Sequence, residues 1–169
     1  MADKYLYNNG GVLTEKAANV SSAGAGDAGK IPALDTTGKL DPSFMPVGVT
    51  PEADSIATTE DLAAGNFVNI YPSSGLKCRK ADATTAGKEA NGFVLAASTS
   101  GQNATVYRIS QSNTQLTGMT PGAKQYLAAT AGTRTETVPS SSGNVIQLLG
   151  IAKSATELIF APNDPIVLA

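Results

Sequence analysis

The fold is decided by Phe67-Val-Asn-Ile-Tyr-Pro-Ser-Ser-Gly-Leu-Lys-Cys-Arg-Lys80. Its first five residues are mostly β-branched or aromatic, as is typical of strands, and Pro72 ends that run. Ser73-Ser-Gly75 then supplies a turn, after which Leu76 to Lys80 can return as a second strand. This pattern predicts an antiparallel hairpin.

Short apolar runs between turn signals continue toward the C-terminus, at a spacing of roughly ten residues that is typical of all-β domains. Phe93 to Ala97 suits a strand buried on both faces, whereas Ala104 to Ser110 alternates as a half-buried strand does. Pro121-Gly122 fits the centre of a type II turn. Further strands are expected at 124–128, 134–138, 144–153 and 156–160, and the first two of these should pair as a hairpin across Ala131-Gly132. We therefore predict a mainly β domain over residues 60–169, a small antiparallel barrel or β-tulip-like sandwich.

Helix is expected to be a minor component. A turn or two could form near Thr58 to Ala64, where a threonine can cap the N-terminus and Gly65 can end the helix.

Residues 1–59 show neither helical nor strand periodicity. Their apolar residues stand apart among small and polar ones, and four prolines favour an extended backbone. Such a segment cannot bury a core of its own. We predict an extended, mostly irregular arm that becomes ordered on a partner; a flexible tail is the alternative. The candidate contact residues are Tyr5, Leu6, Tyr7, Val12, Leu13, Ile31, Leu34, Leu40, Phe44 and Met45.

Charge is sparse in this chain of 169 residues. Charged residues make up 15%, compared with about 25% in typical soluble domains. The net charge is -2 and the basic residues are scattered, so the basic patch expected of a nucleic-acid or anionic-membrane binder is missing. No apolar run approaches the roughly 18 residues that a membrane span requires. We expect neither nucleic acid nor membrane as a partner.

The residues that most often carry catalysis are scarce. The chain has no histidine and a single cysteine, Cys78. Gly24 to Lys30 has the spacing of a phosphate-binding loop, but Ile31 stands where such a loop needs serine or threonine to hold magnesium. We therefore expect no enzymatic activity, no metal and no cofactor.

Two stretches resemble virion proteins of tailed phages. The first is Gly26-Asp-Ala-Gly-Lys-Ile-Pro-Ala-Leu-Asp-Thr-Thr-Gly-Lys-Leu-Asp-Pro-Ser-Phe-Met-Pro46, which is similar to a segment near the N-termini of both head-decoration and tail-fibre proteins. The second spans residues 61–162 and is similar to capsid-decoration β-domains. It includes Gly92-Phe-Val-Leu-Ala-Ala97, Thr120-Pro-Gly-Ala-Lys-Gln-Tyr-Leu-Ala-Ala-Thr-Ala-Gly132 and Val145-Ile-Gln-Leu-Leu-Gly-Ile-Ala152.

The resemblance implies a capsid decoration, or cement, protein. On this interpretation the chain is a homotrimer on the outer surface of the capsid, assembled in the host cytoplasm, and its arm clamps subunits of the major capsid protein. The alternative is a head-fibre or tail-fibre component whose β-domain contacts host surface glycans.

Overall fold

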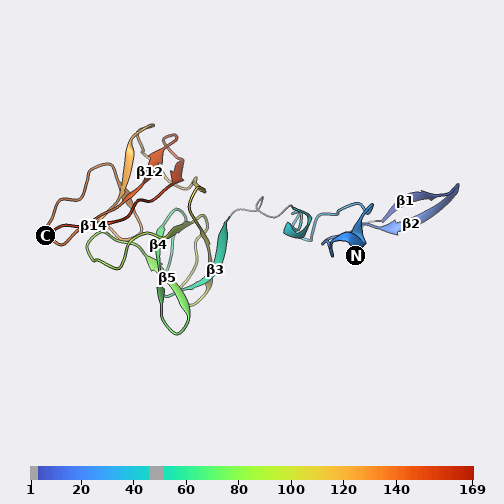
Figure 1. Cartoon of the computed structure of the whole chain (residues 1–169), viewed down its shortest axis with the longest axis horizontal. Coiled ribbons are helices and arrows are strands. Elements are labelled where there is room, and N and C mark those ends of the chain that lie inside the picture. Colours follow the sequence, from blue (N-terminus) through green and yellow to red (C-terminus); the bar gives the residue numbers. More distant parts are fainter. Residues whose placement is uncertain (1–3, 46–51) are drawn as a thin grey trace. The chain divides into compact units, whose positions relative to one another are not determined.

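The structure, a computed structural model, describes residues 4–45 and 52–169. The chain divides into two compact units, Met1–Pro51 and Glu52–Ala169, which we call the N-terminal unit and the body. The described residues are mainly β, as the sequence predicts, and contain no α-helix. Figure 1 shows the strands of each unit.

Five strands of the body close into a barrel in the order β3-β5-β4-β6-β7. Their bounds are Ala53–Thr58 for β3, Phe67–Pro72 for β4, Leu76–Lys80 for β5, Gly92–Val94 for β6 and Asn103–Tyr107 for β7. The predicted hairpin is confirmed, because β4 and β5 pair antiparallel from Val68 opposite Lys80 to Pro72 opposite Leu76. The β3–β5 pair is parallel. Closure leaves the barrel without long open edges.

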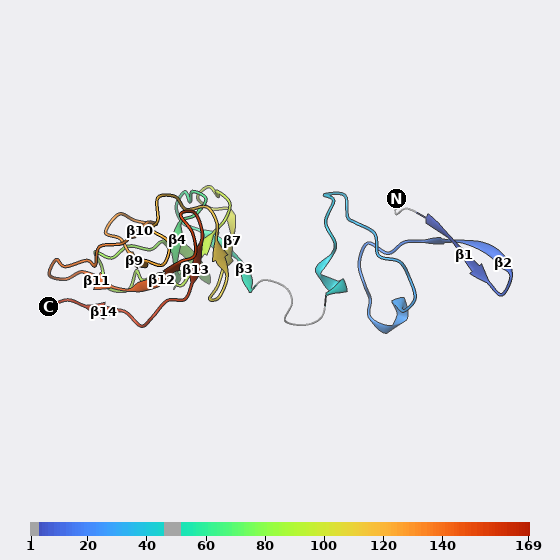
Figure 2. The same cartoon turned by 90° about the horizontal axis from the view of Figure 1, so that it is seen from above.

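A five-stranded sheet forms the rest of the body, in the order β10-β9-β12-β13-β8. Figure 2 shows β9, β10, β12 and β13 near one another. The strands are β8 (Ser112–Asn113), β9 (Lys124–Leu127), β10 (Arg134–Thr135), β12 (Leu148–Ala152) and β13 (Leu158–Phe160). The short strands β11 (Val145–Ile146) and β14 (Ile166–Val167) pair separately. The pairing of β9 with β10 confirms a second predicted hairpin.

Aromatic packing joins the barrel to the sheet. Phe67 on β4, Phe93 on β6 and Phe160 on β13 are fully buried. The ring of Phe160 lies 5.9 Å from that of Phe67 and 5.7 Å from that of Phe93, centroid to centroid, within the range of favourable aromatic pairs. One core therefore draws on both sheets, while Ile56, Val68 and Val106 contribute to a second core cluster on barrel strands.

The predicted extended arm is not confirmed. Within residues 4–45, strands β1 (Lys4–Asn9) and β2 (Val12–Ala17) pair as an antiparallel hairpin, followed by 3-10 turns at Ala25–Asp27 and Pro42–Phe44. The hairpin turn is Gly10-Gly11, with φ of 61° and 94°, and the Asn8 side chain accepts a hydrogen bond from the Gly11 amide. Two consecutive positive φ angles suit a two-residue hairpin turn, which favours glycine.

The body also begins earlier than residue 60. Strand β3 supplies Ile56 and Thr58 to its interior, although Asp54 and Ser55 make this stretch look unlike a strand. The prediction of a helical turn at 58–64 is wrong. Thr58 is the last residue of β3, and Leu62 forms an isolated bridge with Ser98.

Candidate partner-binding surface and polar pocket

The β1–β2 hairpin exposes apolar side chains on both faces. Opposite residues share a face and successive pairs alternate, so Leu6 and Leu13 lie on one face while Tyr7 and Val12 lie on the other. Leu6 is 72% exposed and Leu13 68%, and Val12 and Tyr7 are also exposed. A two-stranded hairpin alone is only marginally stable in water. This one is suited to being covered by another surface.

The charged side chains of the hairpin interact within it. Lys4 forms an ion pair with Glu15, and the Lys16 ammonium lies 3.8 Å from the centroid of the Tyr7 ring. The hairpin therefore offers a partner mainly apolar side chains and backbone edges, and not a surface of predominantly positive or negative charge.

The remaining predicted contact residues lie in the same unit. Ile31, Leu34, Leu40 and Met45 are exposed, while Phe44 and Tyr5 are half-buried. The Tyr5 hydroxyl is buried without a hydrogen-bond partner in the described residues. All ten residues thus belong to a unit in which, across residues 4–45, only Ala18 is buried.

Hydrogen bonds rather than a core shape the N-terminal unit. The Asn19 amide donates to the Ile31 carbonyl at 2.9 Å, and the Ala33 amide donates to the Asn19 carbonyl at 2.7 Å. The Ser22 amide donates to Ser43 Oγ at 2.7 Å. Asp27 accepts from the Ala23 amide and from Lys30 Nζ, at 2.6 and 2.7 Å. The glycine-rich segment is therefore a turn whose lysine is paired with Asp27.

Asp27 gives this turn a defined pH dependence. The hydrogen bond from Lys30, followed by that from the Ala23 amide, lowers the pKa of Asp27 from 3.8 to about 2. Because the pKa is depressed in the folded state, the contribution of Asp27 to stability is present above pH 3.8 and is lost as the pH falls through about 2. We expect a carboxyl-carbon NMR titration to give a midpoint near 2 for Asp27.

Substitution of Lys30 by methionine should move that midpoint toward the ordinary value, because it removes the largest cause of the shift. A midpoint near 4 in the unsubstituted protein would contradict the ion pair and the turn.

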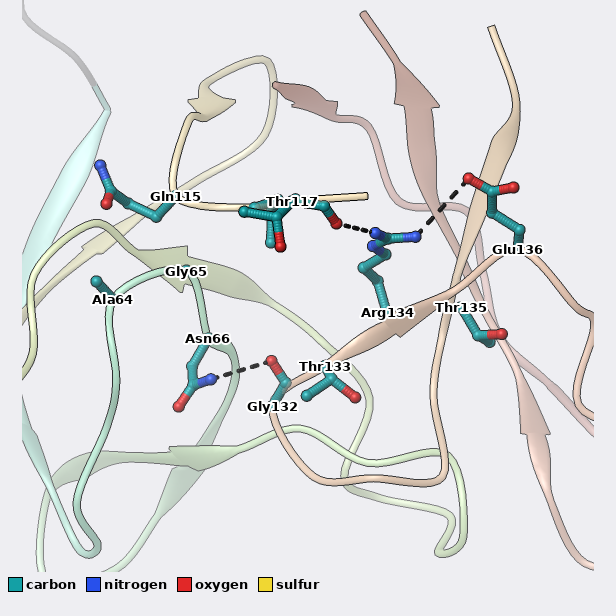
Figure 3. A pocket seen from close by; sticks show the side chains of 11 residues that line it. Ala64, Gly65, Asn66, Gln115, Thr117, Gly132, Thr133, Arg134, Thr135 and Glu136 are labelled. Atoms are coloured by element: carbon teal, nitrogen blue, oxygen red, sulfur yellow. Dashed lines mark hydrogen bonds and ion pairs between the residues drawn. The ribbon is translucent and has the colours of Figure 1, made fainter. Parts of the chain in front are cut away.

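The body holds a polar pocket of about 520 Å³, drawn in Figure 3. Its walls come from the Ala64–Gly65–Asn66 loop, from Gln115 to Thr117, and from Gly132 to Glu136. None of these residues is among the candidate site residues expected from the sequence.

Arg134 forms one wall and is held by two hydrogen bonds and one ion pair. Its guanidinium donates to the Thr117 carbonyl and to Gln125 Oε1, the latter at 3.0 Å, and lies 3.7 Å from Glu136 Oε1. Glu136 also accepts from the Thr120 amide, which is the main reason that its pKa is lowered. The pocket therefore contains a neutralised ion pair rather than a free charge.

No protein-family model and no curated protein matches the chain. Its function therefore has to be inferred from the exposed residues of the N-terminal unit and from the chemistry of the pocket.

Part of the pocket could have been found from the sequence. The predicted pairing of 124–128 with 134–138 is observed with Leu127 opposite Arg134 and Tyr126 opposite Thr135. Continuing that register brings Gln125 close to Glu136, and their side chains are joined by a hydrogen bond of 3.1 Å. The approach of Thr117 to Arg134 carries no such signal, because an irregular loop brings them together.

The single cysteine lies in a structural environment. Cys78 is fully buried in the barrel, and burial raises the pKa of its thiol. Across residues 4–45 and 52–169, no cluster of three or more His, Cys, Asp or Glu side chains could hold a metal ion. The same residues include no helix with the length and apolar character needed to span a bilayer.

Proposed function

We propose that this chain is a structural protein of a tailed-phage virion that binds the outer capsid surface as a decoration protein. The N-terminal unit attaches to subunits of the major capsid protein, and the body supplies the folded mass on the surface. The protein is assembled in the host cytoplasm and acts without a cofactor.

One observation carries the proposal. Residues 4–45 have a defined hydrogen-bonded backbone and several exposed apolar side chains, but only Ala18 among them is buried. Every other buried residue of the described chain lies in the body, and both core clusters consist of body residues. A unit with local structure and no core gains apolar burial when it docks on a partner.

Oligomerisation strengthens such attachment. In a homotrimer, three N-terminal units are tethered to one assembly, so binding of the first raises the effective concentration of the other two. Contacts that are weak individually can then hold the protein on a lattice of repeated coat subunits.

The decisive experiment compares the intact chain with a chain that lacks residues 1–51, using purified capsids of the encoding phage. We expect the truncated protein to remain folded and oligomeric but to lose capsid binding in co-sedimentation. Full occupancy by the truncated protein would refute attachment through the N-terminal unit.

A less drastic variant carries Leu6→Ser and Leu13→Ser in the intact chain. Its control carries Thr105→Ser, an exposed position on β7 in the body. We expect the double variant to bind at least tenfold more weakly, because it removes two of the most exposed apolar side chains from the N-terminal unit.

The fibre alternative is distinguished by copy number and place. Hundreds of copies on the head support decoration, whereas a few copies on the tail support a fibre component.

A further inference from the structure

We propose that the polar pocket of the body binds an uncharged carbohydrate unit. This inference goes beyond attachment to the capsid, since it concerns a site in the body and needs no residue of the N-terminal unit.

The pocket has fixed walls. Gly65 and Gly132 have φ of 87° and 76°. A Cβ on Gly65 would lie 2.8 Å from the Gln115 carbonyl oxygen, and one on Gly132 would lie 2.9 Å from the Asn66 side chain. The Asn66 amide is itself held, because its Oδ1 accepts from the Ala63 amide and its Nδ2 donates to the Gly132 carbonyl. Walls that are already ordered reduce the entropy lost on binding.

The charges of the pocket argue against an anionic ligand. Arg134 is the guanidinium of the pocket, and its Nη atoms already donate to Gln125 and Thr117 and lie beside the Glu136 carboxylate. A phosphate or carboxylate would have to displace these acceptors and would approach Glu136. An uncharged ligand avoids both costs.

The groups available to a ligand are suited to hydrogen bonding with hydroxyl groups. Gln115 and Thr117 are exposed residues of the pocket lining, so a ligand can reach them, and Figure 3 shows the Thr117 side chain directed toward the space above Gly132. An amide and a hydroxyl together both donate and accept, as sugar hydroxyls do. Ala64 and Leu116 add apolar surface for the carbon-bearing face of a ring.

The size of the pocket agrees with this ligand class. A volume of about 520 Å³ lies within the range of small-molecule sites, roughly 300–1,000 Å³. The pocket is open and holds no aromatic platform among its lining residues, so we expect millimolar affinity for a single sugar unit and tighter binding only when several copies act together.

The test is an amide NMR titration of the intact protein with methyl α-D-glucopyranoside, methyl β-D-galactopyranoside, inorganic phosphate and N-acetylglycine methylamide as separate probes. We expect at least one sugar to produce saturable shifts at Gly65, Asn66, Thr117 and Gly132. The proposal is overturned if neither sugar does so, or if phosphate or the peptide probe saturates these amides in their place.

Two threonine variants separate binding at the pocket from general effects. Thr117→Val removes the hydroxyl but keeps the carbonyl that Arg134 contacts, and should weaken sugar binding about tenfold, as expected for one lost hydrogen bond. Thr105→Val, on the exposed side of β7, should bind as the unsubstituted protein does. Unchanged affinity in a folded Thr117→Val protein would also overturn the proposal, since the hydroxyl is the group directed into the pocket.

Discussion

Replacement of Gly150 by alanine is expected to destabilise the body by about 3 kcal/mol or more, through backbone strain and overpacking. Gly150 lies on β12 with φ of 146°. A Cβ there would lie 2.1 Å from the Ile159 carbonyl oxygen and 3.3 Å from the Ala161 amide nitrogen. These are backbone atoms in and next to β13, so the clash cannot be relieved by turning a side chain.

The position of Gly150 explains why the clash is costly. Gly150 pairs with Phe160 on one side and with Gln125 on the other, where the β9–β12 register is irregular. Phe160 is fully buried between Phe67 and Phe93. Moving β13 away from an alanine would therefore disturb the aromatic core that joins the barrel to the sheet.

Gly143→Ala is the matched control. Gly143 also has a positive φ, 80°, but a Cβ there would meet no atom within 4 Å. The Gly143→Ala variant should lose only about 1 kcal/mol of unfolding free energy, which is the cost of placing a non-glycine residue in the left-handed region. Urea denaturation at one fixed protein concentration measures both losses. Equal losses in the two variants would show that the close approach at Gly150 is relieved at little cost.

Local signals predicted much of the body. The β4–β5 and β9–β10 hairpins followed from strand-forming runs separated by turn residues, and Gly122 has the positive φ that the Pro121-Gly122 turn requires. Closure of the barrel carried no comparable signal. It depends on a parallel pair between β3 and β5, and β3 contains Asp54 and Ser55 in place of typical strand residues.

The hairpin of the N-terminal unit also has a local signal in the sequence. Gly10-Gly11, the observed turn, is a known hairpin dipeptide, whereas the prolines and small residues further along favour an extended arm. The lack of a core was nevertheless predictable from composition, since residues 4–45 contain few large apolar side chains and these are widely separated. The polar pocket was predictable only in part, because the segments 64–66 and 115–117 carry no signal that brings them to β10.

Substitution of Gln147 is the other change expected to lower the stability of the body strongly. Its side-chain amide is buried and pairs with the backbone of Ala90, accepting from the Ala90 amide at 2.7 Å and donating to the Ala90 carbonyl at 3.0 Å. Ala90 is also buried and belongs to the core cluster that contains Phe67 and Phe93. Gln147→Leu leaves both backbone groups without these partners, and each buried unsatisfied group costs about 1–3 kcal/mol. We therefore expect Gln147→Leu to lower the free energy of unfolding by roughly 2–5 kcal/mol, measured by urea denaturation.

Gln147→Glu tests the same pair through pH. An ionised carboxylate can accept from the Ala90 amide but cannot donate to the Ala90 carbonyl, and burial disfavours its charge, so its pKa should be raised above the unfolded value of about 4.3. A protonated carboxyl restores the donor. Its stabilising contribution is then fully present below the unfolded pKa and is lost as the pH rises through the folded pKa.

The difference in unfolding free energy between the Gln147→Glu variant and the unsubstituted protein should therefore be small at pH 4 and grow toward pH 8. Subtracting the unsubstituted protein removes the titration of all shared groups, including Asp27 and Glu136. Gln147→Leu is the control, because its loss involves no titrating side chain at this position and should stay constant over the same range. If the difference in unfolding free energy for the glutamate variant does not change with pH, water reaches the Ala90 carbonyl. The pair of hydrogen bonds between Gln147 and Ala90 would then not be shielded from solvent.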